Sequence, residues 1–203
     1  MTQKPLSTYF SLNRRYYRSV NLVRDLDKPD AVQGYVPTEA AAAALRRILP
    51  AFTNLSAHRA WTITGVYGTG KSAFAHYLTA LCADDRTAVK KEALAIAQQA
   101  FDSDSTEYQA IAEHIPSAGL LRVVATGQRE PLSCTVARAL VHTAQRFWRD
   151  QPKPDFWPQL TDWSVELGSR EPNISNQQVL SLLKEIVQAA DAPMLLVVDE
   201  LGK

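Results

Sequence analysis

Apolar residues recur along this chain with two different periods, which predict alternating helices and strands. Spacings of three and four residues predict helices near residues 38–49, 74–82, 89–100, 106–114, 132–147 and 176–187. Short apolar runs predict buried strands at residues 60–64, 119–126 and 194–198. Because strands alternate with helices, the pattern indicates the α/β class, with a parallel sheet between layers of helices.

Local signals refine this outline at several boundaries. Thr38 is a typical N-cap residue, and Ser175 begins a capping-box pattern, so a helix is expected to start after each. Residues 151–170 hold three prolines and two tryptophans without clear periodicity. We therefore expect an irregular insertion there, packed onto the body of the protein by Trp157 and Trp163.

Residues 65–72 match the phosphate-binding pattern G-x-x-x-x-G-K-[ST] at every fixed position. A short glycine-rich turn lets successive backbone N–H groups point at a phosphate tail, and the following helix adds its N-terminal dipole. Lys71 would reach the β- and γ-phosphates, and the Ser72 hydroxyl would bind Mg²⁺. The residues expected to hold the nucleotide are Gly65, Tyr67, Gly68, Thr69, Gly70, Lys71, Ser72 and Ala73.

The flanks of this loop matter more than the pattern, which should occur by chance in roughly one in a hundred unrelated chains of this length. The predicted strand at residues 60–64 comes directly before the loop. Apolar residues at helical spacing, Phe74, Leu78 and Leu81, come directly after it. Strand, loop and helix thus follow in the order that phosphate binding requires. The alternative is a glycine-rich turn with a solvated lysine.

Residues 194–200 form a second motif, an apolar run that ends in Asp199 and Glu200. A strand in a parallel sheet is apolar because helices cover both of its faces. Asp199 at the strand tip would hold Mg²⁺, directly or through water, and Glu200 would polarise the water that attacks the γ-phosphate. This Walker B arrangement predicts Lys71 and Glu200 as catalytic groups, and Ser72 with Asp199 as the metal ligands.

The loop after residues 119–126 is expected at the same sheet edge as the second motif. In a parallel sheet the loops that follow the strands share one edge, where ligands bind. Gln128 and Arg129 would therefore lie at the nucleotide edge, either in contact with the ligand or as surface residues.

The nucleotide itself requires a choice between ATP and GTP. Residues 199–202 also fit D-x-x-G, a pattern of GTPases. More than half of the chain separates these residues from Lys71, however, whereas compact GTPases place their two motifs much closer. A glutamate directly after the Mg²⁺ aspartate is what ATPases use, so the residues favour ATP.

The two motifs and the βα units between them resemble the P-loop ATPases with a catalytic glutamate, in the AAA and STAND branch. The runs Tyr-Gly-Thr-Gly-Lys-Ser and Val-Asp-Glu-Leu-Gly-Lys are similar to those of large bacterial ATPases encoded in phage-defence and restriction-like operons. The resemblance covers residues 35–203 and implies a three-layer α/β P-loop fold that binds ATP and Mg²⁺. Residues 35–38 resemble the place where such proteins cradle adenine.

The resemblance also implies how the chain is organised. In this ATPase branch a strand that follows Walker B in sequence lies between the P-loop strand and the Walker B strand. The chain is therefore expected to be the N-terminal piece of a longer ATPase, with a leading segment at residues 1–55 and a truncated core at residues 56–203. On its own it is expected to be marginally stable, or to need a partner that completes the sheet. Sensor, arginine-finger and lid residues would lie beyond Lys203.

Three functions stay open from the sequence. The first is ATP hydrolysis that powers or switches a larger, oligomeric assembly, in phage defence as the resemblance implies. The second is a module that binds nucleotide without turnover and recruits partners. The third is a small-molecule or nucleoside kinase, which is disfavoured because kinases usually lack the Walker B glutamate and carry an arginine-rich lid.

Composition adds little to this choice. The net charge of +1 over 203 residues gives no reason to expect a protein that coats nucleic acid or a membrane surface. The cations and aromatics of residues 13–18 could stack on a base, but a solvated segment is the simpler interpretation. Cys82 and Cys134 are expected to be small apolar residues on helices. No stretch reaches the ~20 apolar residues of a membrane helix, so a cytoplasmic location is the default expectation.

Overall fold

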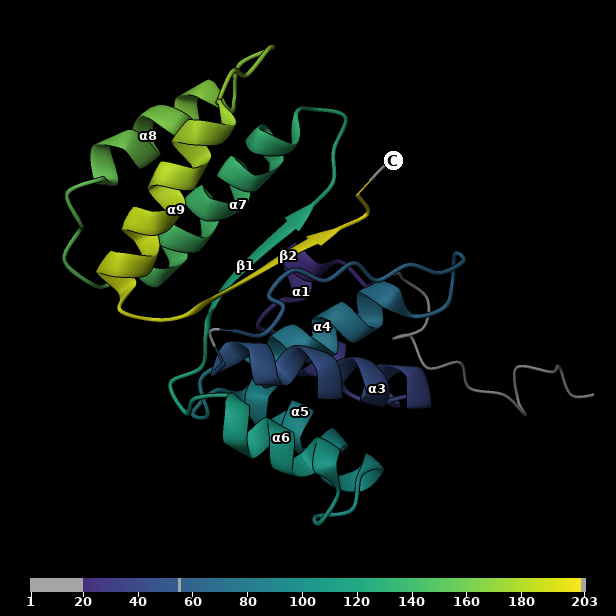
Figure 1. Ribbon diagram of the computed structural model, residues 1–203. Helices are drawn as coiled ribbons and strands as arrows, with labels where there is room; N and C mark the ends of the chain where they lie inside the picture. The colour runs from purple at the N-terminus through teal and green to yellow at the C-terminus, as the bar shows by residue number, and fades with distance from the viewer. Residues whose placement is uncertain (1–19, 55, 202–203) are drawn as a thin grey trace, which may run out of the picture.

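A two-stranded parallel sheet lies between two groups of helices in the computed structural model, which describes residues 20–54 and 56–201 (Figure 1). The elements before the sheet are α1 (Leu22–Asp25), α2 (Pro29–Val32), α3 (Glu39–Ile48), the 3-10 helix η3 (Leu49–Phe52), α4 (Lys71–Leu81), α5 (Ala88–Ala100) and α6 (Thr106–His114). The remaining elements are β1 (Leu121–Thr126), α7 (Leu132–Phe147), α8 (Trp157–Glu166), α9 (Asn176–Ala190) and β2 (Met194–Asp199). The described residues thus combine helices with a two-stranded parallel sheet, which is compatible with the α/β class.

The register of the sheet brings the ends of β1 and β2 together. Leu121 pairs with Met194 at one end, and Thr126 pairs with Asp199 at the other. Helices α7, α8 and α9 lie on one side of the strands, and α3 to α6 lie on the other (Figure 1). A parallel pair needs a long crossover connection, which α7, α8 and α9 supply between β1 and β2.

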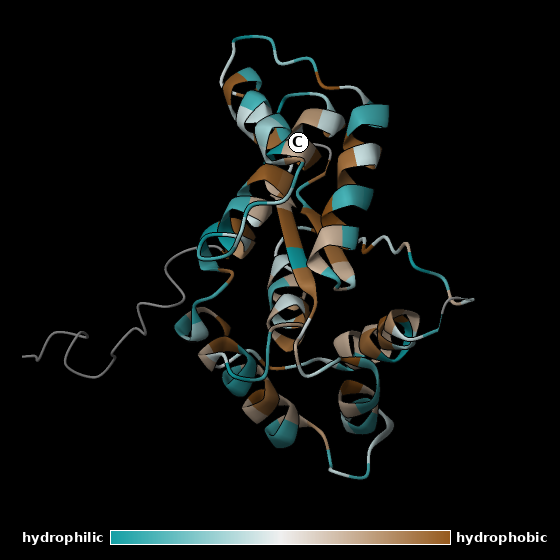
Figure 2. Cartoon of the chain, turned by 90° about the vertical axis from the view of Figure 1, so that its left-hand side faces the viewer, coloured by the Kyte–Doolittle hydropathy of each residue, from teal (hydrophilic) through white to brown (hydrophobic). Residues whose placement is uncertain are grey.

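Each group of helices has its own apolar core. One core joins α2, α3 and η3 to α4, α5 and α6, and its fully buried members include Leu45, Tyr77 and Leu81. The other joins β1 to α7, α8 and α9, with Leu140 and Ile186 fully buried. In Figure 2 the helices carry both brown and teal residues, and the strand seen between the two groups is mostly brown. The expected segment 1–55 thus includes helices that share a core with α4, the helix after the glycine-rich loop.

Helical periodicity and capping signals located most helices correctly. Thr38 caps α3 by accepting a hydrogen bond from the Ala41 N–H (3.2 Å), and the capping box of Ser175 and Gln178 is formed at the start of α9. Cys82 and Cys134 are both buried free thiols, as expected. Burial raises the pKa of the Cys82 thiol to about 12, so this thiol is an apolar core group at neutral pH.

The predicted strand at residues 60–64 is wrong in this structure. These residues are exposed and have no strand assignment, and the side chains of Trp61 and Ile63 are 43% and 44% exposed. β-Branched and aromatic residues favour an extended backbone, but a strand forms only when a neighbouring strand supplies hydrogen bonds. Among the described residues, β1 and β2 pair only with each other, so this segment has no such neighbour.

The expectation of an irregular insertion at residues 151–170 is wrong in part, because α8 occupies its middle. Pro158 lies in the first turn of α8, where a missing N–H costs no helical hydrogen bond. Leu160 and Trp163, three residues apart, are buried in the second core, and Trp157 packs against it. The tryptophans therefore hold the segment to the body as predicted, but on a helix.

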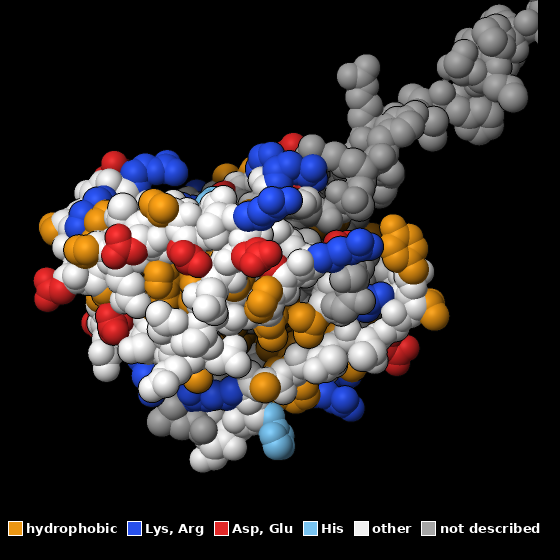
Figure 3. Space-filling model, turned by 90° about the horizontal axis from the view of Figure 1, so that it is seen from above, with side chains coloured by type: hydrophobic (Ala, Val, Ile, Leu, Met, Phe, Trp, Pro, Cys, Tyr) orange, Lys and Arg blue, Asp and Glu red, His pale blue; other side chains and the backbone are white. Residues whose placement is uncertain are grey.

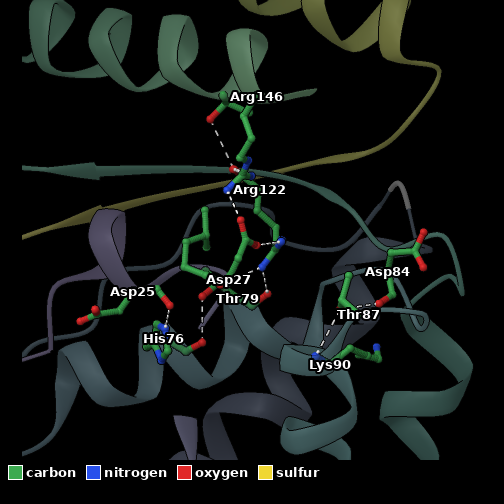
Figure 4. Close-up of polar contacts among 11 residues, drawn as sticks. Asp25, Asp27, His76, Thr79, Asp84, Thr87, Lys90, Arg122 and Arg146 are labelled. Atoms are coloured by element: carbon green, nitrogen blue, oxygen red, sulfur yellow. Dashed lines mark hydrogen bonds and ion pairs between the residues drawn. The ribbon is translucent and has the colours of Figure 1, made fainter. Parts of the chain in front are cut away.

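Residues 20–32 contain two short helices that the sequence did not reveal, and a polar network fastens them to the sheet (Figure 4). The guanidinium of Arg122, a buried residue of β1, donates to Asp27 (2.5 Å) and to the carbonyl oxygens of Leu26 (3.2 Å) and Thr79 (3.5 Å). Arg146 of α7 donates to the other carboxylate oxygen of Asp27 (3.0 Å). Burial lowers the pKa of Arg146, and the charge of Asp27 opposes that shift.

Replacing Arg122 with methionine should lower the free energy of unfolding by about 2 kcal/mol. The apolar side chain keeps most of the volume but leaves the two carbonyl oxygens without their donor; the loss is limited because Asp27 is half-exposed and keeps Arg146. Urea denaturation measures the change. The exposed Arg170→Met is the control and should stay within about 0.5 kcal/mol of wild type. Equal urea midpoints for Arg122→Met and Arg170→Met would show that the Arg122 contacts do not stabilise the fold.

Tyr77→Phe should raise the free energy of unfolding by about 1 kcal/mol, because the variant removes a buried hydroxyl that lacks a hydrogen-bond partner among the described residues. Tyr77 is fully buried in α4, and burial raises the pKa of its hydroxyl. Thermal unfolding measures the effect, with Tyr35→Phe as the control on the neighbouring ring. A marked loss of stability in Tyr77→Phe would show that the hydroxyl has a partner in solution.

Candidate nucleotide-binding site

Two glycines of the glycine-rich loop have left-handed backbone conformations. Gly68 and Gly70 have φ angles of 83° and 84°, in the left-handed region that side chains disfavour. A Cβ atom at either position would meet no atom within 4 Å, so the need for glycine there is conformational and the space beside them is open. Residues 61–70 are all exposed. The loop is thus shaped as an open turn with its backbone accessible.

Lys71 folds over this turn. Its Nζ atom donates hydrogen bonds to the carbonyl oxygens of Gly65 and Val66, each at 2.8 Å. The Thr69 hydroxyl donates to the same Val66 oxygen (2.9 Å). The ammonium group therefore lies against the concave backbone of the loop, where it would meet an incoming phosphate.

Helix α4 begins directly at the end of the loop. Gly70 is its N-cap, Lys71 its first residue, and Ser72 and Ala73 lie in its first turn. The N–H groups at the start of a helix have no carbonyl acceptor within the helix, because the acceptor would lie four residues earlier. Together with the helix dipole, they favour an anion at this position. The predicted residues Gly65 to Ala73 are thereby brought together at one helix terminus.

Residues 35–38 are tied to the same helix. The ring of Tyr35 stacks on Tyr77 of α4, with centroids 4.7 Å apart and planes at 30°. Burial raises the pKa of Tyr35 to about 12, so its hydroxyl stays neutral. Val36, the next residue, is 75% exposed. The segment expected to cradle adenine therefore packs beside the helix that begins at the phosphate loop.

The far end of α4 is held by Lys90 of α5. Its buried ammonium group donates to the carbonyl oxygen of Leu81, the last residue of α4, and lies 3.6 Å from a carboxylate oxygen of Asp85. A cation at a helix C-terminus compensates the negative end of the dipole. Burial lowers the pKa of Lys90, with Asp85 opposing the shift. Lys90 is a structural contact that the helical periodicity of the sequence could not distinguish from a surface lysine.

Asp199 and Glu200 lie at the tip of β2, as predicted. The Glu200 N–H donates to the Asp199 side chain (3.0 Å), and the Asp199 carbonyl accepts from the Gly127 N–H (2.8 Å). Glu200 has a φ of 58°, a left-handed conformation that is unfavourable for a residue with a Cβ. The turn after β2 is therefore a constrained piece of backbone.

Helix α4, which begins at the phosphate loop, contacts β2, the strand that ends in the acidic motif. Ala75 of α4 and Val197 of β2 pack against the same small apolar cluster. In Figure 1 the arrowheads of both strands and the first turn of α4 point to the same side of the molecule. The phosphate loop and the acidic strand tip, far apart in the sequence, thus lie on the same side of the molecule.

The two motifs carry oxygen donors of the chemical kind that Mg²⁺ prefers. A bound Mg²⁺ ion would take the Ser72 hydroxyl and the Asp199 carboxylate as protein ligands, with waters and substrate phosphates as the others. Among residues 20–54 and 56–201, no group of three or more His, Cys, Asp or Glu side chains could hold a metal by itself.

Some predicted residues are less directly placed. Gln128 and Arg129 are exposed in the loop that begins at Gly127, beside Asp199. Residues 13–18 lie outside the described part of the chain. Sequence reasoning missed Gly127, whose only signal was a glycine directly after a predicted strand.

Comparison with protein-family models, with curated proteins and with solved structures found no match to this chain. None of the helices in the described part has the length and apolar character needed to span a membrane. On the face seen in Figure 3, acidic and basic side chains are interspersed, in keeping with the near-zero net charge.

Proposed function

We propose that this chain is a P-loop nucleotide-binding protein of the AAA and STAND type that binds ATP with Mg²⁺ at residues 65–73. One observation carries the proposal. The loop has left-handed glycines at two positions, a lysine folded onto its backbone, and a helix N-terminus directly after it. Each of these features favours the binding of a polyphosphate for its own physical reason. A solvated glycine-rich turn without a ligand would not require the three features in combination.

Hydrolysis is the activity that the acidic strand tip supports. Lys71 would neutralise charge on the β- and γ-phosphates, Ser72 and Asp199 would hold the metal, and Glu200 would orient the attacking water. Bound Mg²⁺ would supply charge neutralisation between the phosphates. The proposed role of turnover is to drive or switch a larger assembly, in the setting of phage defence that the resemblance implies.

Titration with ATP, in Mg²⁺ and then in EDTA, tests the proposal. We expect saturable binding to one site per chain that Mg²⁺ strengthens, with ADP and ATP both bound and GTP bound more weakly. Release of phosphate over time then reports turnover. Absence of saturable binding to any nucleotide would remove the proposal.

A module that binds nucleotide without turnover is the second candidate, and the exposure of the site favours it. Residues 61–70 are exposed throughout, and residues 60–64 have no strand neighbour among the described residues. Efficient hydrolysis requires that bulk water be excluded around the γ-phosphate. Binding by the wild-type chain without phosphate release would select this candidate.

A further inference from the structure

We propose that Gly127 is a positioning residue, which lets the loop after β1 pack directly against the backbone of Asp199 and Glu200 and hold Glu200 in its left-handed conformation. The inference rests on the proposed function, since it concerns the acidic tip of the same nucleotide site. It adds a residue that neither nucleotide motif contains.

Space is the reason for a glycine at this position. The φ angle of Gly127 lies outside the left-handed region, so its own backbone would accept any residue. A Cβ atom there, however, would lie 2.6 Å from the Glu200 carbonyl oxygen and 3.1 Å from the Glu200 carbonyl carbon. Both are backbone atoms, so no side-chain rotation relieves the contact.

Hydrogen bonds to β2 and to α7 hold the loop after β1 against the backbone of Asp199 and Glu200. The Gly127 N–H donates to the Asp199 carbonyl (2.8 Å), which completes the last pair of the β1–β2 ladder, Thr126 with Asp199. The loop is then anchored to α7, because Glu130 accepts from the Thr135 hydroxyl (3.0 Å) and from the Arg138 guanidinium (3.0 Å). The loop therefore cannot retreat without breaking these bonds.

A Cβ atom at position 127 would displace the backbone of Glu200. To bring an alanine Cβ into ordinary contact, the two backbones must separate by roughly 0.8 Å. Glu200 already has an unfavourable φ of 58°, which persists only while its surroundings enforce it. Relaxation of that residue would turn its carboxylate away from the water it is proposed to orient, and it would shift Asp199 much less because the ladder continues to hold β2.

Gly127→Ala tests this inference against Gly119→Ala. Gly119 precedes β1 at its opposite end, and a Cβ there would also lie 2.6 Å from backbone atoms, those of Ala83 and Asp84. Gly119 also has a left-handed φ of 73°, so Gly119→Ala introduces a clash and backbone strain at least as large as those of Gly127→Ala, far from Glu200. Wild type and both variants are compared in ATP affinity in EDTA, ATP affinity in Mg²⁺, phosphate release and urea midpoint.

We expect Gly127→Ala to keep its affinity in EDTA within about twofold, because the phosphate loop is untouched. Phosphate release should fall about 100-fold, whereas the gain in affinity from Mg²⁺ should stay within about twofold of wild type, because Asp199 keeps its place in the ladder. Gly119→Ala should lose stability but keep both readouts. Wild-type phosphate release in Gly127→Ala, or an equal fall in both variants, would overturn the inference.

Two further outcomes are also decisive. If the wild-type protein binds no nucleotide, the proposed function and this inference are both overturned. If the wild-type protein binds nucleotide but Gly127→Ala changes neither affinity nor phosphate release, only the inference is overturned. Should Gly127→Ala fail to fold, Glu130→Ala frees the same loop without adding atoms near Glu200. It should then reduce phosphate release with unchanged affinity in EDTA, and a wild-type result would overturn the inference.

Discussion

Lys71→Ala is expected to reduce ATP affinity by about 100-fold or more, to below detection in a direct titration. The ammonium group lies against the loop backbone, 2.8 Å from the carbonyl oxygens of Gly65 and Val66, in the position from which it would meet the β- and γ-phosphates. Its removal would take away a charge-assisted hydrogen bond to phosphate and also the hydrogen bonds from Lys71 to the carbonyl oxygens of the turn. Calorimetry or a fluorescent ATP analogue measures the affinity.

Lys91→Ala provides the matched control for this experiment. Lys91 is an exposed lysine on α5, so its loss changes the net charge equally without touching the loop. The control should bind ATP as wild type does. Equal affinity in Lys71→Ala and Lys91→Ala would show that the loop is only a glycine-rich turn with a solvated lysine.

Glu200→Gln is expected to retain ATP and Mg²⁺ but to lower turnover by about 10² to 10⁴-fold. Glutamine preserves the size of the side chain and the backbone at this constrained position, but it cannot accept a proton from the attacking water. Asp199, the proposed metal ligand, is unchanged, so binding should be preserved. Single-turnover phosphate release with saturating ATP measures the chemical step separately from binding.

The exposed Glu171→Gln is the control for this substitution, and it should hydrolyse ATP at the wild-type rate. Glu200→Gln protein with wild-type turnover would contradict the assignment of Glu200. A wild-type chain that binds ATP and releases no phosphate would instead support the binding module, with Glu200 at most a contact to metal-bound water.

The candidate site was largely predictable because its two motifs are local. The spacing of Gly65, Gly70 and Lys71 is set by the loop itself, and the start of α4 follows from the apolar residues at helical spacing. The apolar run before Asp199 similarly located β2. What could not be predicted was the partner of the strand tip, since Gly127 precedes Asp199 by a large stretch of chain and becomes its neighbour only through the parallel register.

The errors in the fold share one cause, which is that local preference was judged without knowledge of neighbours. Residues 60–64 prefer an extended backbone but have no strand beside them among the described residues. Prolines suggested irregular structure near α8, yet Pro158 lies in the helical turn that tolerates it. Arg122 looked like a polar residue in an otherwise apolar strand, and only the position of residues 20–32 supplied its partner Asp27.

The amino-acid sequence by itself determined the α/β class, the helices with periodic apolar faces and the phosphate-loop pattern, because each depends on residues within about four positions of one another. The tertiary structure alone decided which strands pair, how α4 meets β2, and why residue 127 is a glycine. Those features depend on contacts between distant segments, whose geometry is set by packing and hydrogen bonding across the sheet rather than by the preference of any one segment.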